Sequence, residues 1–144
     1  MLEPFRVTID IRTDDLDVNG HVRGPAYLAY ADHARWECVA AAGVDPLVLK
    51  AENLGPVNLE TTIRFRRELR ARARIDVLTR FAWEPGKVSR VVQEFLTPDG
   101  AVVAEVESLS GLLDLDRRRL VADPAHYWRK YASRPENLGL TRTS

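Results

Sequence analysis

The chain has 144 residues, a length that predicts one domain with one hydrophobic core. Apolar residues make up 45% and charged residues 29%, and Lys plus Arg balance Asp plus Glu at 21 each. This composition excludes a disordered chain, a disulfide scaffold, a membrane-spanning protein and a nucleic-acid binder held by bulk charge.

The amino-terminal residues lack the apolar stretch of a secretory signal, and the one cysteine, Cys38, has no partner for an intramolecular disulfide. Both features indicate a reducing compartment, so we expect a cytoplasmic protein.

The first predicted element is a strand over residues 4–12, because apolar and polar side chains alternate there. A loop rich in Asp, Asn and Gly follows over 13–24. The next element is a helix over 26–42, which Pro25 opens and Gly43 ends. Alanine and tyrosine recur at helical spacing and little polar surface remains, so this helix is predicted to be buried.

The remaining sequence is mostly strand-like. A short helix is predicted over 45–52 and another from Asp123 and Pro124 to Tyr131, each with an aspartate cap followed by proline. Alternating patterns separated by tight turns predict four long strands, over 57–66, 73–83, 88–96 and 101–115. Residues 135–144 are expected to form a loose tail.

Consecutive strands with short connections pair antiparallel, and strands of this length curve. We therefore predict an α+β fold in which a five-stranded curved antiparallel sheet wraps around a long central helix, within one domain over residues 1–134. Because an open sheet leaves two edges, a symmetric dimer is also expected.

The segment from Asp14 to Tyr27 places a carboxylate, an amide and an imidazole on the loop before the long helix. Unpaired amides at a helix start can hold an anion or polarise a carbonyl oxygen. Asp17 is a candidate nucleophile or general base, and Asn19 and His21 are candidates to orient water or substrate. Pro25 has no N–H, so the donors are expected at its neighbours Gly24, Ala26 and Tyr27.

The residues Asp17-Val-Asn-Gly-His-Val22, followed by Tyr27 and Ala34-Arg-Trp-Glu37, resemble the hotdog-fold acyl-CoA thioesterases. The 4-hydroxybenzoyl-CoA thioesterase-like branch is the most similar, and the loop also resembles a motif of plant acyl-ACP thioesterases. The resemblance implies a hotdog domain and a hydrolase that cleaves an acyl-CoA thioester to free acid and CoA. It further implies that Asp17 is the catalytic carboxylate and that the helix start from Gly24 to Tyr27 holds the thioester oxygen.

The resemblance also implies a homodimer or homotetramer. One departure concerns substrate contacts, because Arg23-Gly24 stands where relatives often carry two asparagines. Arg23 is therefore a candidate to meet a phosphate or carboxylate.

Further candidates come from the basic run on the strands, where Arg66, Arg67 and Arg70 are expected to contact the phosphates of CoA. A solvated outer face is the alternative for this run. Tyr30 is a candidate for lining a substrate pocket, or a core residue like Tyr27. Cys38 lies on an apolar helix face and is interpreted as a core residue. No metal site or cofactor is expected, because the histidines lack ligand spacing.

Other hypotheses remain open. Asp17 can stabilise the turn at Asn19 and Gly20 without any catalytic role. The substrate can be an acyl or polyketide chain on a carrier protein instead of CoA, and hotdog folds also host hydratases. The hypothesis without catalysis is an acyl-CoA-binding protein.

Overall fold

The computed structural model describes residues 4–141 of the protein. Its elements in chain order are β1 (Phe5–Asp10), the 3₁₀ turn η1 (Thr13–Asp15), α1 (Gly24–Ala41), α2 (Pro46–Ala51), β2 (Leu54–Phe65), β3 (Arg74–Ala82), β4 (Ser89–Leu96), β5 (Val102–Asp114), β6 (Arg119–Leu120), α3 (Pro124–Tyr131) and the 3₁₀ turn η2 (Pro135–Leu138).

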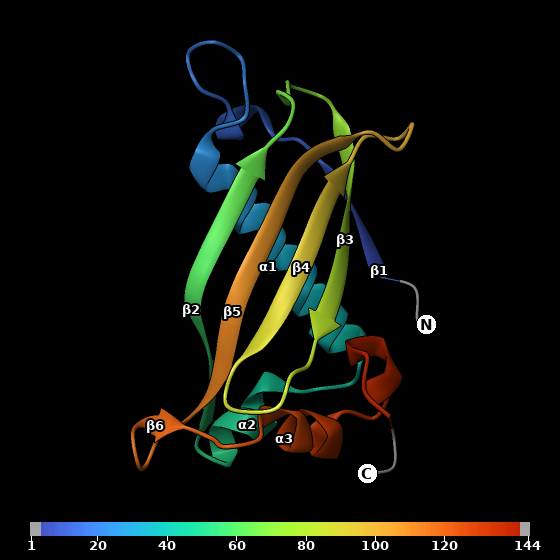
Figure 1. Cartoon of the computed structure of the whole chain (residues 1–144). Coiled ribbons are helices and arrows are strands. Elements are labelled where there is room, and N and C mark those ends of the chain that lie inside the picture. The colour runs from blue at the N-terminus through green and yellow to red at the C-terminus, as the bar shows by residue number, and fades with distance from the viewer. Residues whose placement is uncertain (1–3, 142–144) are drawn as a thin grey trace.

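The strands form one antiparallel sheet in the order β1-β3-β4-β5-β2, and the short β6 pairs with β5 (Figure 1). The predicted curved antiparallel sheet of five main strands is therefore confirmed, with β6 as an addition. β1 and β2 are the edge strands, and β2 is twice as long as β1, with 12 residues against six.

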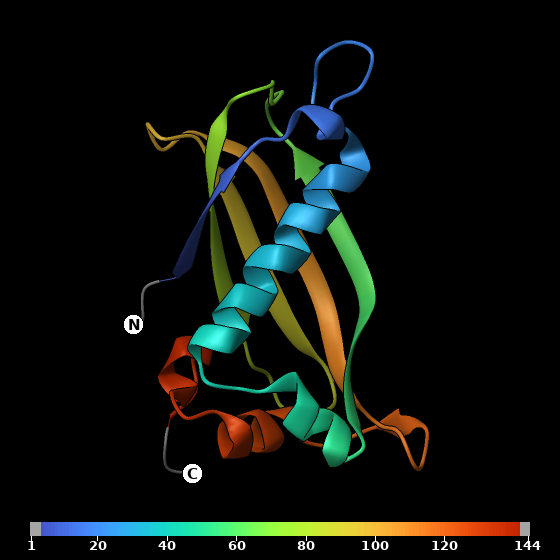
Figure 2. The same ribbon diagram turned by 180° about the vertical axis from the view of Figure 1, so that it is seen from behind.

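The long helix α1 lies diagonally across one face of the sheet (Figures 1 and 2). Its sheet-facing side carries small residues such as Ala31 and Ala34, which let the helix backbone approach the strands closely. The opposite side is open, and Leu28 is 45% exposed. The predicted curved sheet wrapped around a long central helix is confirmed. The helix is buried on its sheet-facing side only, because the strands cover that side alone.

Two groups of buried side chains follow α1 along the sheet. The group near the start of α1 includes Tyr27, Val77 and Phe95, and the group near its end includes Leu112 and Cys38. The Cys38 thiol is fully buried and lies 3.5 Å from the carbonyl oxygen of Asn137, and burial raises its pKa to about 12. A thiol with such a raised pKa stays protonated at neutral pH, so the interpretation of Cys38 as a core residue is confirmed.

The carboxyl-terminal segment packs against this second group. Leu138 is 1% exposed and Leu140 is 6% exposed, and the indole Nε1 of Trp83 donates to the carbonyl oxygen of Leu138 at 2.7 Å. The expected loose tail is therefore wrong for residues 135–141, because their leucines cover the end of α1 that the sheet leaves open. The rest of the expected tail, 142–144, lies outside the described residues.

A β-bulge interrupts β2 at Leu59, where the pairing with β5 shifts between Asn58 and Glu60. A bulge moves the residues on one side of it to the opposite face of a strand. Asn58, which the simple alternation groups with the outward polar residues, accordingly accepts a hydrogen bond from Arg35 of α1. Alternation alone gave the wrong face for Asn58, because the extra residue breaks the period of two.

Candidate functional site

The loop before α1 is a tight turn closed by Asp17. One carboxylate oxygen of Asp17, Oδ1, accepts hydrogen bonds from the backbone amides of Asn19 at 2.8 Å and His21 at 3.1 Å. The amide of Asp17 in turn donates to the carbonyl oxygen of His21 at 2.8 Å. This loop projects beyond the sheet at the top of Figure 1, and Val18 at its tip is fully exposed.

These contacts change the pKa of the Asp17 carboxyl. The hydrogen bonds from the amides of His21 and Asn19 lower the pKa of the Asp17 carboxyl, since they stabilise the charged form. The side chain is exposed, and its second oxygen, Oδ2, has no hydrogen-bond partner within residues 4–141. Asp17 therefore presents one ionised oxygen to solvent while the other oxygen maintains the turn.

His21 meets a carboxylate from a distant part of the chain. Its Nε2 lies 3.1 Å from Oε2 of Glu68, and the same oxygen lies 3.6 Å from the guanidinium of Arg70. A backbone bridge between His21 and Arg70 holds these two segments together. The imidazole is half-buried, with 28% of the side chain exposed. The pair with Glu68 thus links the loop before α1 to the segment after β2.

A surface hollow lies at the same place. Its walls come from the loop, the start of α1 and the segment after β2, and are lined by His21, Val22, Gly24, Tyr27, Phe65, Arg66, Arg67, Glu68 and Leu69. The apolar lining contains Tyr27, whose ring packs edge-to-face against Phe65 and stacks on Phe95. The hollow thus combines an apolar wall with an imidazole, a carboxylate and two guanidinium groups.

The start of α1 contributes backbone donors to this hollow. Gly24 is the first helical residue, and the amides of a first helical turn have no acceptor within the helix. The amide of Ala26 donates to the carbonyl oxygen of Arg23 at 3.0 Å, so this predicted donor is already engaged. No side chain caps the helix start. Gly24 and Tyr27, the other two predicted donors, both line the hollow.

Tyr30 lies outside the hollow. Its hydroxyl donates to Oδ2 of Asp15 at 2.6 Å, and burial together with this bond raises the pKa of Tyr30. The backbone carbonyl oxygen of Asp15 also accepts a hydrogen bond from the backbone amide of Arg23 at 2.9 Å. Tyr30 thus anchors the loop on α1 and is buried in the core, which confirms the alternative of a core residue over that of a pocket-lining residue.

The structure brings together some of the predicted site residues and separates others. His21, Gly24, Tyr27, Arg66 and Arg67 line one hollow, and Arg70 approaches it through Glu68. The predicted residues outside its lining are Asp17, Asn19, Arg23, Ala26, Tyr30 and Arg70.

Sequence reasoning missed Glu68 and Phe65 as site residues. Glu68 stands in a basic run, and nothing near it in the sequence points to His21, which is 47 positions away. An isolated acidic residue among the arginines was the one available signal.

Two further searches of the described part of the chain bear on function. No group of three or more His, Cys, Asp or Glu side chains within residues 4–141 is placed to hold a metal ion. In the same range, no helix is both long enough and apolar enough to cross a membrane.

Comparison with known proteins identifies the family. A model of the thioesterase-like superfamily matches residues 11–133, which is most of the chain. No curated protein sequence matches.

Several solved structures are similar to this chain, and thioesterases are among them. The probable thioesterase YbaW from Escherichia coli is 25% identical with a TM-score of 0.75, covering 82% of this chain and 89% of its own. The 1,4-dihydroxy-2-naphthoyl-CoA thioesterase Slr0204 from Synechocystis is 13% identical with a TM-score of 0.78, covering 85% of this chain and 91% of its own. The Staphylococcus aureus protein SAV2348, solved in complex with CoA, is 19% identical with a TM-score of 0.78, covering 98% of this chain and 96% of its own. The chain therefore belongs to the thioesterase-like superfamily, with the hotdog fold of these proteins, and is a thioester hydrolase.

Proposed function

We propose that the protein hydrolyses an acyl-CoA thioester to a free acid and CoA at the hollow beside the start of α1. The observation that carries this proposal is the convergence of the Gly24 amide, the His21–Glu68 pair and the arginines on one hollow. The protein SAV2348, which has the same fold, was solved with CoA bound, which supports CoA as the thiol portion.

In the proposed mechanism the thioester carbonyl oxygen accepts a hydrogen bond from the Gly24 amide. This donor and the positive end of the α1 dipole stabilise the oxyanion that forms when the carbonyl is attacked. A thiolate is a good leaving group because it is weakly basic, so a strong general acid is not needed at the sulfur.

Asp17 can act by two routes. As a nucleophile, its Oδ2 attacks the carbonyl carbon, the C–S bond breaks, and CoA leaves as a thiolate. Water then cleaves the mixed anhydride and restores the carboxylate. As a general base, Asp17 instead takes a proton from the attacking water. Its lowered pKa keeps Asp17 in the carboxylate form that both routes require. Because Asp17 lies on the projecting loop rather than in the lining of the hollow, either route requires the substrate to reach that loop.

The arginines are proposed to contact the CoA phosphates. Arg66 and Arg67 line the hollow, and Arg70 lies 3.6 Å from Glu68, which is part of the same lining. Arg66 also meets Glu105 at 3.3 Å, an exposed pair that a phosphate can displace at little cost. Arg23, exposed at the helix start, is a fourth candidate.

We also propose a homodimer built on the edge strand β2, with a homotetramer of such dimers as the larger assembly. β2 is a long edge whose exposed residues include the apolar Leu59 and Phe65, at 50% and 57% exposure. An exposed apolar edge strand favours pairing with a second copy. The buried free thiol of Cys38 supports a reducing cytoplasm as the proposed location.

The test measures thiol release from a panel of short-chain, long-chain and aromatic acyl-CoAs. We expect Asp17→Asn to lower kcat by at least about 100-fold, since removing a catalytic carboxylate typically costs this much. Asparagine keeps the oxygen that accepts the two loop amides, so the turn is retained. The matched control is Asp14→Asn, another exposed carboxylate of this loop, which pairs with Arg12 and should keep near wild-type turnover.

Three outcomes would contradict the proposal. Near wild-type turnover in Asp17→Asn would remove Asp17 from the mechanism. If wild type releases no thiol from any acyl-CoA but cleaves the same acyl groups from a carrier protein, the substrate is the carrier-bound chain. Tight binding of acyl-CoA without hydrolysis of either form would establish a binding protein.

A further inference from the structure

The loop that carries Asp17 is an exposed hairpin, and its position depends on how its two arms are held. A backbone bridge between Leu16 and Val22 closes the hairpin, and Val18 at its tip is fully exposed. The arm after the tip is held to the segment between β2 and β3, because the Val22 amide donates to the carbonyl oxygen of Leu69 at 2.8 Å. Asp17 lies on the other arm, so different contacts set its position.

The arm that carries Asp17 is fixed at Asp15, two residues before it. The Oδ2 atom of Asp15 accepts a hydrogen bond from the Tyr30 hydroxyl at 2.6 Å, and its backbone carbonyl oxygen accepts one from the Arg23 amide at 2.9 Å. Arg23 directly precedes Gly24, the first residue of α1. Asp15 thus joins three parts of the proposed site, which are the Asp17 arm, the start of α1 and the body of α1.

Tyr30 makes its contact from a rigid position in α1. It is 6% exposed and belongs to the same buried group as Tyr27 and Phe95. It lies six residues beyond Gly24, which is about 9 Å along the helix, and the Cα–Cβ bonds of a helix tilt toward its start. The side chain therefore reaches back from the core to the base of the hairpin.

The bond between Tyr30 and Asp15 is of a strong kind. Burial and the Asp15 carboxylate raise the pKa of the Tyr30 hydroxyl, so the hydroxyl stays protonated and remains a donor at neutral pH. A hydrogen bond to a charged acceptor is shorter and stronger than one between neutral groups. The bond is also partly buried, so water competes with it less than with the exposed contacts of the hairpin tip.

We infer that Tyr30 is a positioning residue, which through Asp15 holds the Asp17 carboxylate in place relative to the start of α1. This inference rests on the proposed function, in which Asp17 and the helix start act on the same thioester carbonyl. Reacting groups must be held in the productive geometry, and a misplacement of about 1 Å can lower a rate about 100-fold. Tyr30 therefore affects turnover although it lies outside the lining of the hollow.

Tyr30→Phe tests this role, because phenylalanine keeps the buried ring and removes only the hydroxyl. We expect kcat for thiol release from the best acyl-CoA to fall about 10- to 100-fold, with KM within about twofold of wild type. In an Asp17→Asn background, the same substitution should change kcat by less than about twofold, because residues that act as a unit are not additive. A general loss of folding would lower kcat equally in both backgrounds.

Hydrogen exchange measured by mass spectrometry follows the hairpin independently of catalysis. In Tyr30→Phe, the backbone amides of residues 14–23 should exchange at least about 10-fold faster, because one arm of the hairpin loses a hydrogen bond to a charged group. The amides of β4 and β5 should keep their wild-type rates, since the ring of residue 30 still fills its place in the core.

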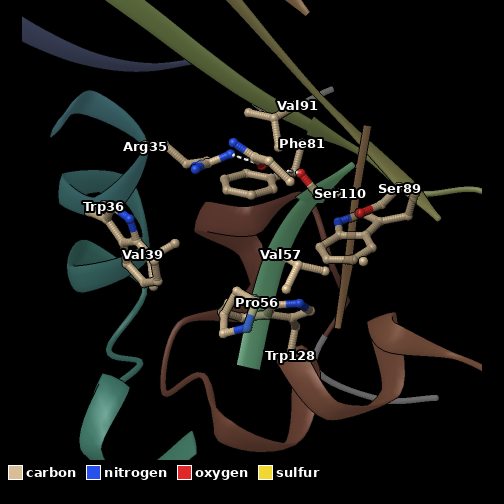
Figure 3. A pocket seen from close by; sticks show the side chains of 13 residues that line it. Arg35, Trp36, Val39, Pro56, Val57, Phe81, Ser89, Val91, Ser110 and Trp128 are labelled. Atoms are coloured by element: carbon tan, nitrogen blue, oxygen red, sulfur yellow. Dashed lines mark hydrogen bonds between the residues drawn. The ribbon is translucent and has the colours of Figure 1, made fainter. Parts of the chain in front are cut away.

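Ser110→Ala is the matched control, because it also removes one hydroxyl that donates to a side-chain oxygen. Ser110 donates to Oδ1 of Asn58 at 3.0 Å, beside the cavity that Trp36, Trp83 and Trp128 line toward the other end of α1 (Figure 3). This variant should keep wild-type kcat and wild-type exchange over residues 14–23.

The outcomes separate this inference from the proposed function. Near wild-type kcat in Tyr30→Phe, or unchanged exchange over residues 14–23, would overturn the positioning role. A fall in kcat of the same size in the Asp17→Asn background would overturn it as well. Faster exchange of the hairpin in a protein whose wild type cleaves no thioester would instead contradict the proposed function and leave the contact between Tyr30 and Asp15 as an anchor of the loop.

Discussion

Single residues determine the pH range in which the proposed mechanism operates. Two backbone amides lower the pKa of Asp17 below the ordinary aspartate value of 3.8, so its carboxylate remains charged at lower pH than in an unfolded chain. Its contribution to the stability of the turn is therefore fully present above pH 3.8. That contribution is lost only as the pH falls through the lower folded value.

We expect the acid limb of kcat/KM to lie below pH 3.8, because the reactive form of Asp17 is the carboxylate and its pKa is lowered. The measurement is the pH dependence of thiol release from the best acyl-CoA. Circular dichroism at each pH is the control that separates protonation of the site from unfolding. An acid limb near neutral pH would show that a different group limits the reaction.

Among the elements, the carboxyl-terminal segment contributes to the core although it is short and follows the last helix. Its η2 turn packs Leu138 against the end of α1 and holds the indole of Trp83. The segment therefore stabilises both the end of α1 and the position of the Trp83 indole.

Leu138→Ala should lower the free energy of unfolding by about 2–5 kcal/mol, the usual cost of truncating a buried leucine. Urea denaturation measures this change. Leu47→Ala in α2 is the matched control, since Leu47 is 73% exposed and should cost far less. Equal effects of the two substitutions would mean that the segment contributes little to stability.

For the whole molecule, the prediction concerns assembly through β2. Leu59 forms the bulge of this edge strand and is half exposed. A lysine on an edge strand opposes pairing with another strand, because its charge loses water on association. We expect Leu59→Lys to raise the dimer dissociation constant at least about tenfold, or about 1.4 kcal/mol.

Analytical ultracentrifugation over a concentration series measures this change, with Leu47→Lys as an exposed control away from the sheet. A monomeric wild type, or a dimer as tight in Leu59→Lys, would contradict assembly through β2.

Only some residues of the proposed site could be predicted from the sequence. Asp17, His21 and Gly24 belong to one continuous segment, so their motif is visible without a structure. Glu68 comes from the loop between β2 and β3, and no spacing rule links it to His21. Long-range contacts of this kind depend on strand register, which the sequence pattern does not specify residue by residue.

The sequence by itself determined the order of the elements and the loop-to-helix motif, because periodicity, caps and turn residues act over a few positions. Only the tertiary structure decided which side of α1 is covered, where the bulge at Leu59 shifts the faces of β2, and that the segment after α3 packs down. It also decided that all three tryptophans surround one cavity. Each of these features arises from packing between residues distant in the chain, where burial of apolar surface overrides local preference.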